Sequence, residues 1–413
     1  MSAAAHVAIV GTGQAAVQTA EALRSGGFEG AITLLGDEAH GPYHRPPLSK
    51  AWLAGEIEAA QLVMRAPEML ARKGIHLRTG VRVLAIDRSA GTLSLSDGST
   101  LAYTGLVLAT GATPRRLSLP GGHAPNVLAL RSQDDAAAIA SELARCSAQG
   151  LPVVIVGGGF IGLEVAATAR RKGLSVTVLE SAPRLLGRVL APMLGDWYAD
   201  LHRGHGVQVA LGAQIAGFDI AADGLAGGVR LQDGQVHRAG LVVLGVGVAA
   251  NDGLAQAAGL ACDRGIVVDA CGRTADPRIV AAGDCTARRL ADGSLLRLES
   301  VQNATEQGKS AAAALLGQER PFTATPWFWS DQYDRKLQMA GISAGADAWV
   351  LRGSLQQGPF SVYHFRAGQL VAVDSVNATK DHLLARKLLD ARLSPRPEQV
   401  ADPAFDLAAL LTA

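Results

Sequence analysis

The stretch His6-Val-Ala-Ile-Val-Gly-Thr-Gly-Gln-Ala-Ala16 decides the fold class of this 413-residue chain. It joins an apolar run to the pattern G-x-G-x-x-A and leads into an alanine-rich segment of helical character. In such a unit the first glycine allows a tight turn, the second lets the backbone approach a pyrophosphate, and the third position packs helix against strand. A second apolar run at 31–35 completes a βαβ unit, so the stretch predicts a dinucleotide site.

A second copy of the pattern lies in the middle of the chain. It reads Pro152-Val-Val-Ile-Val-Gly-Gly-Gly-Phe-Ile-Gly162, followed by a helical segment and a strand pattern that ends at Glu180. One such pattern is weak evidence in a chain with 48 glycines, because glycines also serve close packing. Here each copy follows a β-branched run, opens a helix and leads to an acidic residue, and the pair predicts two dinucleotide sites.

Three further segments indicate the domain boundaries. The stretches 106–111 and 241–247 are apolar strand patterns that end in small-residue turns, where the chain enters and leaves an inserted domain. After Pro326 the chain becomes aromatic and alternating, which favours an antiparallel sheet. We expect an α/β fold with two Rossmann-like dinucleotide-binding domains and a C-terminal α+β domain. The expected ranges are 1–112 with 248–326, then 113–247, and finally 327–413.

Composition excludes several classes of function. The net charge of +1 creates no global field that would attract nucleic acid or an anionic membrane. The longest apolar runs are half of the roughly 20 residues that a membrane helix needs. The four cysteines form no C-x-x-C or C-x-x-x-x-C pair and lack metal-ligand spacing with histidine. We therefore expect a cytoplasmic protein without a zinc site, a dithiol centre, a nucleic-acid partner or a membrane partner.

The whole chain resembles the FAD-containing pyridine-nucleotide reductases, and in particular the ferredoxin reductases of oxygenase systems. The resemblance implies a glutathione-reductase-like architecture, with non-covalent FAD bound by 1–112 and 248–326 and NADH bound by 113–247. Four of the shared motifs are much more specific than a glycine pattern: GGGFIGLEVAATA, GDC, ESVQNA and PWFWSDQY. The motifs are GTGQAA from Gly11, PPLSK at 46–50, ATG at 109–111, GGGFIGLEVAATA from Gly157, GDC at 283–285, ESVQNA at 299–304 and PWFWSDQY from Pro326.

The resemblance also implies roles at the flavin. Lys50 is expected beside the reactive ring nitrogen, with Glu164 as its ion-pair partner near the nicotinamide; alternatively, Glu164 is a carboxylate favoured by the helix dipole. Asp37 is expected to hold the adenosine ribose, or else is an ordinary turn residue. The two expected catalytic residues are Lys50 and Glu164, and the implied FAD set is Gly11, Gly13, Ala15, Ala16, Asp37, Arg45, Lys50, Val83, Arg131, Asp284, Val301, Gln302 and Trp329.

For the second nucleotide, Glu180 is placed to accept both hydroxyl groups of the NADH ribose. A 2′-phosphate would meet this carboxylate as a like charge, which favours NADH over NADPH. Arg184 either binds the adenosine moiety of NADH or weakens the discrimination against NADPH. The implied NADH set is Gly157, Gly159, Ile161, Gly162, Glu180, Arg184 and Gly247.

The expected acceptor is a small acidic two-iron two-sulfur ferredoxin, which in turn serves a heme-thiolate monooxygenase or a ring-hydroxylating dioxygenase. The chain has no cysteine pair after its first βαβ unit, so electrons must leave directly from the flavin. Arg65 and Lys309 match basic docking positions, unless they are solvated surface charges. Trp329 matches an aromatic residue near the docking face, unless it serves core packing. Gln338 stands where a basic residue is expected.

Two other functions remain open from the sequence. One is an NADH-dependent reductase of rubredoxin, or of a small organic acceptor such as monodehydroascorbate, on the same scaffold. The other, from a different class, is an NADH-sensing flavoprotein interaction module. The segment PWFWSDQY favours the ferredoxin reductases, but a shared scaffold does not by itself identify the acceptor.

Overall fold

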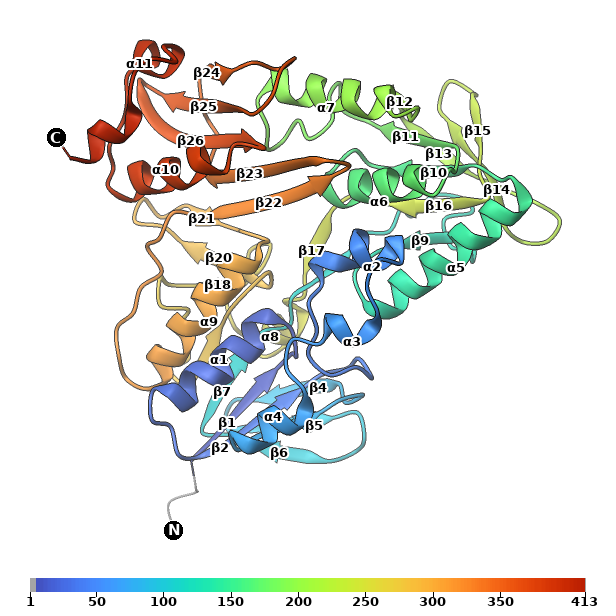
Figure 1. Ribbon diagram of the computed structural model, residues 1–413. Coiled ribbons are helices and arrows are strands. Elements are labelled where there is room, and N and C mark those ends of the chain that lie inside the picture. Colours follow the sequence, from blue (N-terminus) through green and yellow to red (C-terminus); the bar gives the residue numbers. More distant parts are fainter. Residues whose placement is uncertain (1–4, 413) are drawn as a thin grey trace. The chain divides into compact units, whose positions relative to one another are not determined.

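The computed structural model (Figure 1) describes residues 5–412. Contacts between residues divide the chain into two compact units. Unit 1 contains the chain up to His44 together with Ala59–Thr113 and Val248–Ala324. Unit 2 contains Arg45–Glu58, Pro114–Gly247 and the chain from Thr325 onward. The second dinucleotide-binding segment and the C-terminal segment thus belong to one unit, and the three expected domain ranges stay a prediction.

A parallel five-stranded sheet forms the centre of unit 1. Its order is β19-β7-β1-β2-β3, and apolar residues that are buried on both faces build its inner strands, as expected for a parallel sheet. Helices α1 and α9 pack against each other beside it (Figure 1). The elements are β1 (His6–Val10), α1 (Gln14–Ser25), β2 (Ala31–Leu35), α3 (Ala59–Leu62), α4 (Pro67–Arg72), β3 (Ile75–Arg78), β7 (Gly105–Leu108), β19 (Ile279–Ala281) and α9 (Val301–Leu315).

Smaller sheets complete unit 1. Strands β4, β5 and β6 form an antiparallel sheet, β18, β20 and β21 form a second small sheet, and β8 pairs with β17. Their bounds are β4 (Val83–Asp87), β5 (Thr92–Leu95), β6 (Thr100–Ala102), β8 (Ala112–Pro114), β17 (Val248–Ala250), α8 (Gly253–Ala257), β18 (Ile266–Val268), β20 (Thr286–Arg289) and β21 (Leu295–Leu296).

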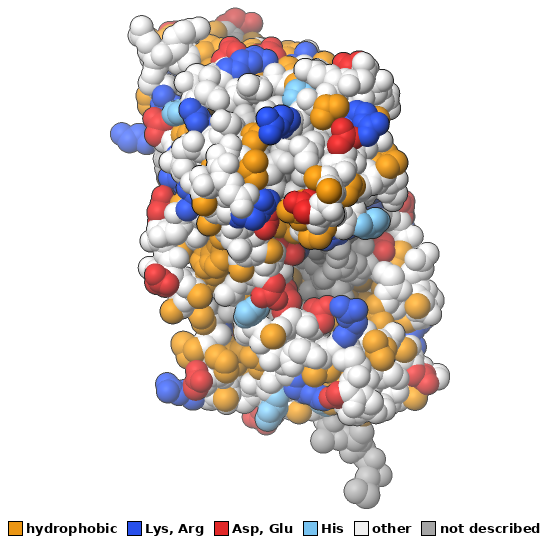
Figure 2. Space-filling model, turned by 90° about the vertical axis from the view of Figure 1, so that its right-hand side faces the viewer, with side chains coloured by type: hydrophobic (Ala, Val, Ile, Leu, Met, Phe, Trp, Pro, Cys, Tyr) orange, Lys and Arg blue, Asp and Glu red, His pale blue; other side chains and the backbone are white. Residues whose placement is uncertain are grey.

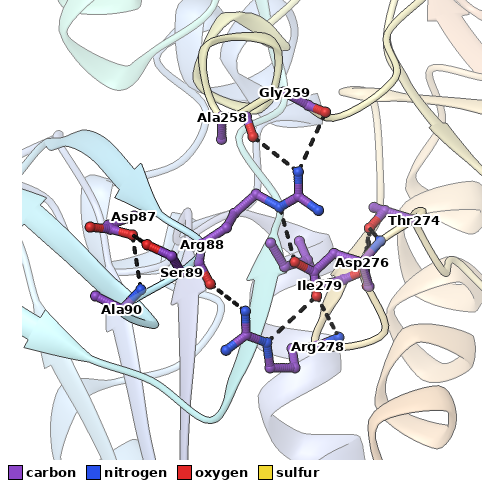
Figure 3. Close-up of polar contacts among 10 residues, drawn as sticks. All are labelled: Asp87, Arg88, Ser89, Ala90, Ala258, Gly259, Thr274, Asp276, Arg278 and Ile279. Carbon is purple, nitrogen blue, oxygen red and sulfur yellow. Dashed lines mark hydrogen bonds and ion pairs between the residues drawn. The ribbon is translucent and has the colours of Figure 1, made fainter.

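A buried carboxylate ties two distant segments of unit 1 together. Asp276, whose side chain is 6% exposed, accepts a hydrogen bond of 2.9 Å from the Arg88 guanidinium and one of 3.0 Å from the Arg278 backbone N–H (Figure 3). Arg88 also donates to the carbonyl of Ala258. Because Arg88 follows β4 and Asp276 precedes β19, these contacts fasten the antiparallel sheet to the segment that returns after residue 248.

Unit 2 contains a second parallel five-stranded sheet, of order β12-β11-β10-β16-β9, with helices α5 and α6 packed against its strands. A three-stranded antiparallel sheet, β13-β14-β15, adjoins it in sequence. The elements are η1 (Pro46–Ser49), α2 (Ala51–Ala54), β9 (Val127–Ala129), α5 (Gln133–Gln149), β10 (Val153–Val156), α6 (Phe160–Arg171), β11 (Val176–Glu180), α7 (Pro192–Gly204), β12 (Gln208–Leu211), β13 (Ile215–Ile220), β14 (Ala226–Leu231), β15 (Val236–Arg238) and β16 (Leu241–Leu244).

The C-terminal part of unit 2 is an antiparallel sheet of order β22-β23-β26-β25-β24, covered by α10. Apolar residues of β25, β26 and α10 share one hydrophobic core. The elements are β22 (Trp327–Gln332), β23 (Arg335–Gly341), β24 (Ala348–Gly353), β25 (Phe360–Arg366), β26 (Gln369–Val376), α10 (Thr379–Asp390), α11 (Pro397–Ala401) and η2 (Leu407–Leu411). The expected fold class, two Rossmann-like sheets followed by an α+β segment, is confirmed.

The surface agrees with the balanced charge of the chain. Figure 2 shows Lys and Arg side chains interspersed with Asp and Glu over the visible face. Among residues 5–412, no helix is long and apolar enough to cross a membrane. The same residues contain no cluster of His, Cys, Asp and Glu side chains suited to a metal ion.

Candidate functional site

The first glycine turn, between β1 and α1, leaves a helix N-terminus open. Gly11 has φ +124°, and a Cβ at this position would lie 2.2 Å from the carbonyl oxygen of Ala109. Gly13 is the N-cap of α1, and no side chain among the described residues caps the helix. A Cβ at Gly13 would meet no described atom within 4 Å. Ala15 and Ala16 are buried beneath this turn. Open N–H groups at a helix start suit the pyrophosphate of a dinucleotide.

The loop after β19 lies against the same helix. Gly283 approaches α1 so closely that a Cβ there would be 3.0 Å from the Cβ of Ala15. The Gly283 N–H donates to the side-chain oxygen of Gln307 in α9 at 2.7 Å. Asp284, the next residue, is half-buried. The structure therefore places Asp284 within unit 1 next to the turn that contains Gly13.

The other residues expected at FAD in unit 1 lie at the ends of elements. Asp37 is two residues past β2, is 56% exposed, and forms an ion pair of 3.3 Å with Arg82. Val83 begins β4 and is buried in the apolar core below the sheet. Val301 and Gln302 form the first turn of α9, where the side chain of Ser300 caps the helix. Their roles at the cofactor stay predictions.

The second glycine turn, in unit 2, repeats the geometry of the first. Gly157 has φ +103°, and a Cβ there would lie 2.4 Å from the carbonyl oxygen of Gly245. A Cβ at Gly162 would lie 2.4 Å from the carbonyl oxygen of Gly157, so this position demands glycine for close packing. Gly159 is the N-cap of α6 and has no side-chain cap in the described chain. Ile161, on the first turn of α6, is 39% exposed.

Glu180 lies at the end of β11 and contacts this turn directly. Its Oε2 accepts the Gly158 N–H at 2.6 Å, and its Oε1 accepts the Ala182 N–H at 2.7 Å. Arg184 is exposed in the loop that follows. The same loop carries Arg188, whose guanidinium lies 3.8 Å from the position that a Cβ on Gly247 would take. Arg188 was not predicted, because nothing in its sequence neighbourhood separates it from an ordinary surface arginine.

A charged pair of unit 2 with a buried carboxylate joins the PPLSK segment to α6. The ammonium of Lys50 lies 2.7 Å from Glu164 Oε2, and these side chains are 19% and 4% exposed. Ser49 also donates to Oε2, at 2.5 Å, and Ser330 donates to Oε1 at 2.6 Å. Glu164 thus accepts from three donors that come from two distant segments. A buried carboxylate is tolerated when such partners replace water.

Helix α6 also holds the PPLSK segment in place. Thr168 donates from its hydroxyl to the carbonyl of Ser49 at 3.0 Å. Further along the helix, Arg171 pairs with Glu56 at 3.0 Å and Lys172 donates to the carbonyl of Ala54. Ser49, Thr168 and Ser330 all lie inside motifs that carry the resemblance, but sequence reasoning singled out none of them.

Arg45, Arg131 and Trp329 also belong to unit 2. Arg45 donates to the backbone carbonyl of Arg131 at 2.8 Å, so the structure brings these two residues together. Trp329 is half-buried in β22, its ring centroid 5.7 Å from that of Trp327. It lies opposite Gln338 on β23, and Gln338 accepts a hydrogen bond from Thr379 at 2.9 Å. The position where a basic residue was expected is therefore occupied by a buried amide.

Arg65 and Lys309 line one hollow in unit 1. The hollow has a volume of about 510 Å³ and is also lined by Lys73, Arg320 and Glu21. The guanidinium of Arg65 donates two hydrogen bonds, of 2.8 and 3.1 Å, to the carboxylate of Glu21. The ammonium of Lys73 contacts the same carboxylate at 2.6 Å. Burial would raise the pKa of Glu21, but its hydrogen bonds to Arg65 and Lys73 hold that pKa below its usual range.

A second carboxylate organises the other side of this hollow. Glu306 contacts Lys309 at 2.7 Å and Arg320 at 3.3 Å. Arg65, Lys73, Lys309 and Arg320 are each between 34 and 47% exposed. The hollow therefore presents several ordered and partly hydrated cations, and an acidic surface would complement it.

All four cysteines lie in the described part of the chain and are free, and three of them are buried. Burial raises the pKa of Cys285 and of Cys146, so these thiols are poor nucleophiles.

Two Rossmann-like sheets, each with an open glycine turn, define a class: an oxidoreductase that binds two dinucleotides. A family model described as "Pyridine nucleotide-disulphide oxidoreductase" matches residues 5–308, and one described as "Reductase C-terminal" matches residues 327–411. The chain belongs to the pyridine nucleotide-disulphide oxidoreductase family.

Within this family, the chain is similar to reductases of known name. Rhodocoxin reductase from Rhodococcus erythropolis is 45% identical over 97% of this chain and 93% of its own length. Putidaredoxin reductase from Pseudomonas putida is 42% identical, covering 100% and 98% of the two chains. The crystal structure of the covalent putidaredoxin reductase–putidaredoxin complex superimposes with a TM-score of 0.94, at 41% identity and with 99% and 98% coverage. The resemblance to ferredoxin reductases of oxygenase systems is confirmed.

Proposed function

We propose that this protein is a cytoplasmic, NADH-dependent flavoprotein reductase that passes electrons one at a time to a two-iron two-sulfur ferredoxin. The ferredoxin would serve a heme-thiolate monooxygenase or a ring-hydroxylating dioxygenase. The observation that carries the choice of acceptor is the hollow of ordered cations around Arg65 and Lys309. The free cysteines suit a reducing compartment.

The residues of unit 1 fit the pyrophosphate of FAD. The open start of α1 at Gly13 would receive the two phosphates, and Asp284 would bind the ribityl chain. Bound FAD would supply hydride acceptance and single-electron release, which protein side chains do not provide. The residues of the chain have to bind, orient and exclude water.

Lys50 and Glu164 are the proposed catalytic residues. The carboxylate of Glu164, held by three donors, fixes the ammonium of Lys50 in one position. A fixed cation stabilises negative charge that develops nearby, and it does so more strongly in a water-poor site than in water. We assign to Lys50 the stabilisation of charge at the flavin, and to Glu164 the placement of Lys50 and contact with the nicotinamide amide.

Glu180 is proposed to select NADH. Its carboxylate lies at the open turn of α6, where the ribose of the nucleotide would be bound. Ribose hydroxyls would donate to the two carboxylate oxygens, whereas a 2′-phosphate would be repelled. Arg184 and Arg188, in the adjacent loop, would contact the adenosine end.

Charge reversal tests the acceptor. The double variant Arg65→Glu with Lys309→Glu should reduce ferredoxin turnover at least tenfold at low salt, because it removes two cations from the docking face. Reduction of ferricyanide, a small acceptor, should be unchanged. Arg264→Glu is the matched control, because Arg264 is 73% exposed and lies in unit 1 outside the hollow. Unchanged ferredoxin turnover in the double variant would contradict the proposed acceptor site.

A further inference from the structure

A continuous chain of buried polar side chains leads away from Glu164. Ser330 Oγ donates to Glu164 Oε1 at 2.6 Å, and Gln332 Nε2 donates to Ser330 Oγ at 3.2 Å. On the far side of Gln332, its Oε1 lies 2.9 Å from His202 Nε2. His202 Nδ1 in turn lies 3.2 Å from the hydroxyl of Tyr333. Three elements of unit 2, α6, β22 and α7, therefore meet through one line of hydrogen bonds.

The members of this chain are almost completely removed from solvent. Ser330 and His202 are 0% exposed, Gln332 is 1% exposed and Glu164 is 4% exposed. Polar groups in such a position are costly unless each one is paired. A buried network that is fully paired holds its members rigidly in one arrangement. The sequence spacing of these residues did not suggest any connection among them.

The charge of Glu164 fixes the direction of every bond in the chain. An ionised carboxylate only accepts hydrogen bonds, so the single hydroxyl hydrogen of Ser330 is donated to Glu164. Ser330 can then only accept from Gln332, which turns the amide NH₂ group toward Ser330 and the amide oxygen toward His202. His202 must therefore carry its proton on Nε2, and its Nδ1 accepts from the Tyr333 hydroxyl.

The two titratable groups at the outer end remain uncharged over a wide range of pH. Burial lowers the pKa of His202 to about 4. Burial likewise raises the pKa of Tyr333 to about 12. At neutral pH His202 thus acts as a neutral donor with a defined tautomer and brings no second cation toward Glu164.

Tyr333 occupies a backbone position that disfavours its residue type. It follows β22 in the turn that leads to β23 and has φ +56°. This left-handed region is uncommon for a bulky side chain. The ring of Tyr333 stacks on His205, with centroids 3.7 Å apart and planes 8° from parallel. The turn therefore keeps a tyrosine, in an unfavourable conformation, where its hydroxyl reaches His202.

We propose that Ser330, Gln332 and His202 are positioning residues that set the direction of hydrogen bonding toward Glu164 and keep its second oxygen available to Lys50. Ser330 occupies Oε1, which leaves Oε2 for Ser49 and Lys50. The inference deepens the proposed function, and it rests on the role assigned there to Lys50 and Glu164.

The first test reads the tautomer of His202 directly. The flavin-loaded protein is labelled with ¹⁵N-histidine, and two-bond ¹H–¹⁵N spectra are recorded between pH 6 and 9, with His202→Gln assigning the signal. We expect one neutral tautomer protonated on Nε2 in the wild type. Ser330→Ala should add a second population protonated on Nδ1, because Gln332 is then free to turn. A wild-type Nδ1–H tautomer, or a Ser330→Ala spectrum identical to that of the wild type, would overturn the proposal.

The second test separates positioning from binding. In single-turnover flavin reduction, Ser330→Ala should lower the limiting rate about tenfold, the lower end of the effect of losing a hydrogen bond to a charged group, while the Kd for NADH stays the same. Ser361→Ala is the matched control, because Ser361 is also a fully buried, hydrogen-bonded serine of unit 2. The flavin of His202→Gln, which retains an N–H donor, should be reduced by NADH faster than the flavin of His202→Met. Equal limiting rates in Ser330→Ala and Ser361→Ala would overturn the proposal.

Lys50→Ala distinguishes this failure from a failure of the proposed function. If Lys50→Ala leaves flavin reduction unchanged, the role assigned to the pair of Lys50 and Glu164 is wrong, whatever the tautomer of His202. If Lys50→Ala slows flavin reduction and Ser330→Ala does not, the role assigned to Lys50 and Glu164 stands. The positioning role proposed for Ser330, Gln332 and His202 is then wrong.

Discussion

Glu180→Gln should shift the preference of the protein away from NADH. In the structure the two carboxylate oxygens accept the N–H groups of Gly158 and Ala182 at 2.6 and 2.7 Å. The amide of glutamine retains one acceptor and turns a donor toward one of these partners. A hydrogen bond to a charged group contributes about 1.5–3 kcal/mol. Losing the bond that a ribose hydroxyl would donate to the carboxylate should therefore lower kcat/KM for NADH about 10- to 150-fold.

The same change should help NADPH. Two unit charges 4 Å apart interact by about 4 kcal/mol at an effective dielectric constant of 20. Glu180 is half-buried, so solvent screens part of this repulsion, and a gain of about tenfold in kcat/KM for NADPH is the expected lower bound. Together the two effects should move the NADH-to-NADPH ratio by at least 100-fold.

The assay is steady-state reduction of ferricyanide, which avoids any effect on ferredoxin docking. KM and kcat are measured for both nucleotides in the wild type, in Glu180→Gln and in Asp200→Asn. Asp200 is a suitable control because its side chain is 78% exposed on α7 and pairs with Arg203 on the same helix. A ratio in Glu180→Gln that stays within twofold of the wild-type ratio would refute the assigned role of Glu180.

Three other predictions concern the flavin and the stability of unit 1. Lys50→Ala should slow single-turnover flavin reduction by NADH about 10- to 100-fold, measured by stopped-flow absorbance, and an unchanged rate would remove its role. Gly11→Ala should yield protein that retains little FAD on gel filtration, because its Cβ would collide with the carbonyl of Ala109; full retention would contradict this close approach. Asp276→Asn should lower the free energy of unfolding at pH 7 by about 2–3 kcal/mol, because Arg88 loses a charged partner. Burial alone would raise the pKa of Asp276, but the Arg278 N–H and the Arg88 guanidinium hold that pKa below its usual range. Its stabilisation is therefore complete above the unfolded pKa of about 4 and disappears as the pH falls through the folded value. Urea titrations at pH 7 and pH 3 should show the difference narrowing, and a difference that widens at pH 3 would contradict this.

The sequence predicted the local features of the fold because short-range physics dictates them. The turns at Gly11 and Gly157 require a backbone conformation or a close approach that favours glycine, so their spacing reveals both strand-turn-helix units. Buried parallel strands appear as continuous apolar runs, which located the central strands of both sheets. These features supported the prediction of the fold class, which the two parallel sheets of the structure confirm.

Contacts between distant segments were much harder to predict from the sequence. His202, Ser330 and Glu164 come from α7, β22 and α6, and no sequence spacing signals that their side chains form one chain. Glu21 and Glu306 form ion pairs with the cations of the hollow. The sequence did not indicate this role either, because a carboxylate on a helix usually belongs to a solvated face. Such pairings depend on how elements pack in three dimensions.

The most direct test of the central claim is NADH-driven cytochrome c reduction by the purified protein, with and without a two-iron two-sulfur ferredoxin from the same source. Flavin absorbance is followed anaerobically in parallel. We predict that NADH bleaches the flavin and that cytochrome c reduction depends on the ferredoxin and saturates with it. A flavin that NADH reduces, combined with cytochrome c turnover that ferredoxin does not increase, would contradict the assignment of ferredoxin as the acceptor.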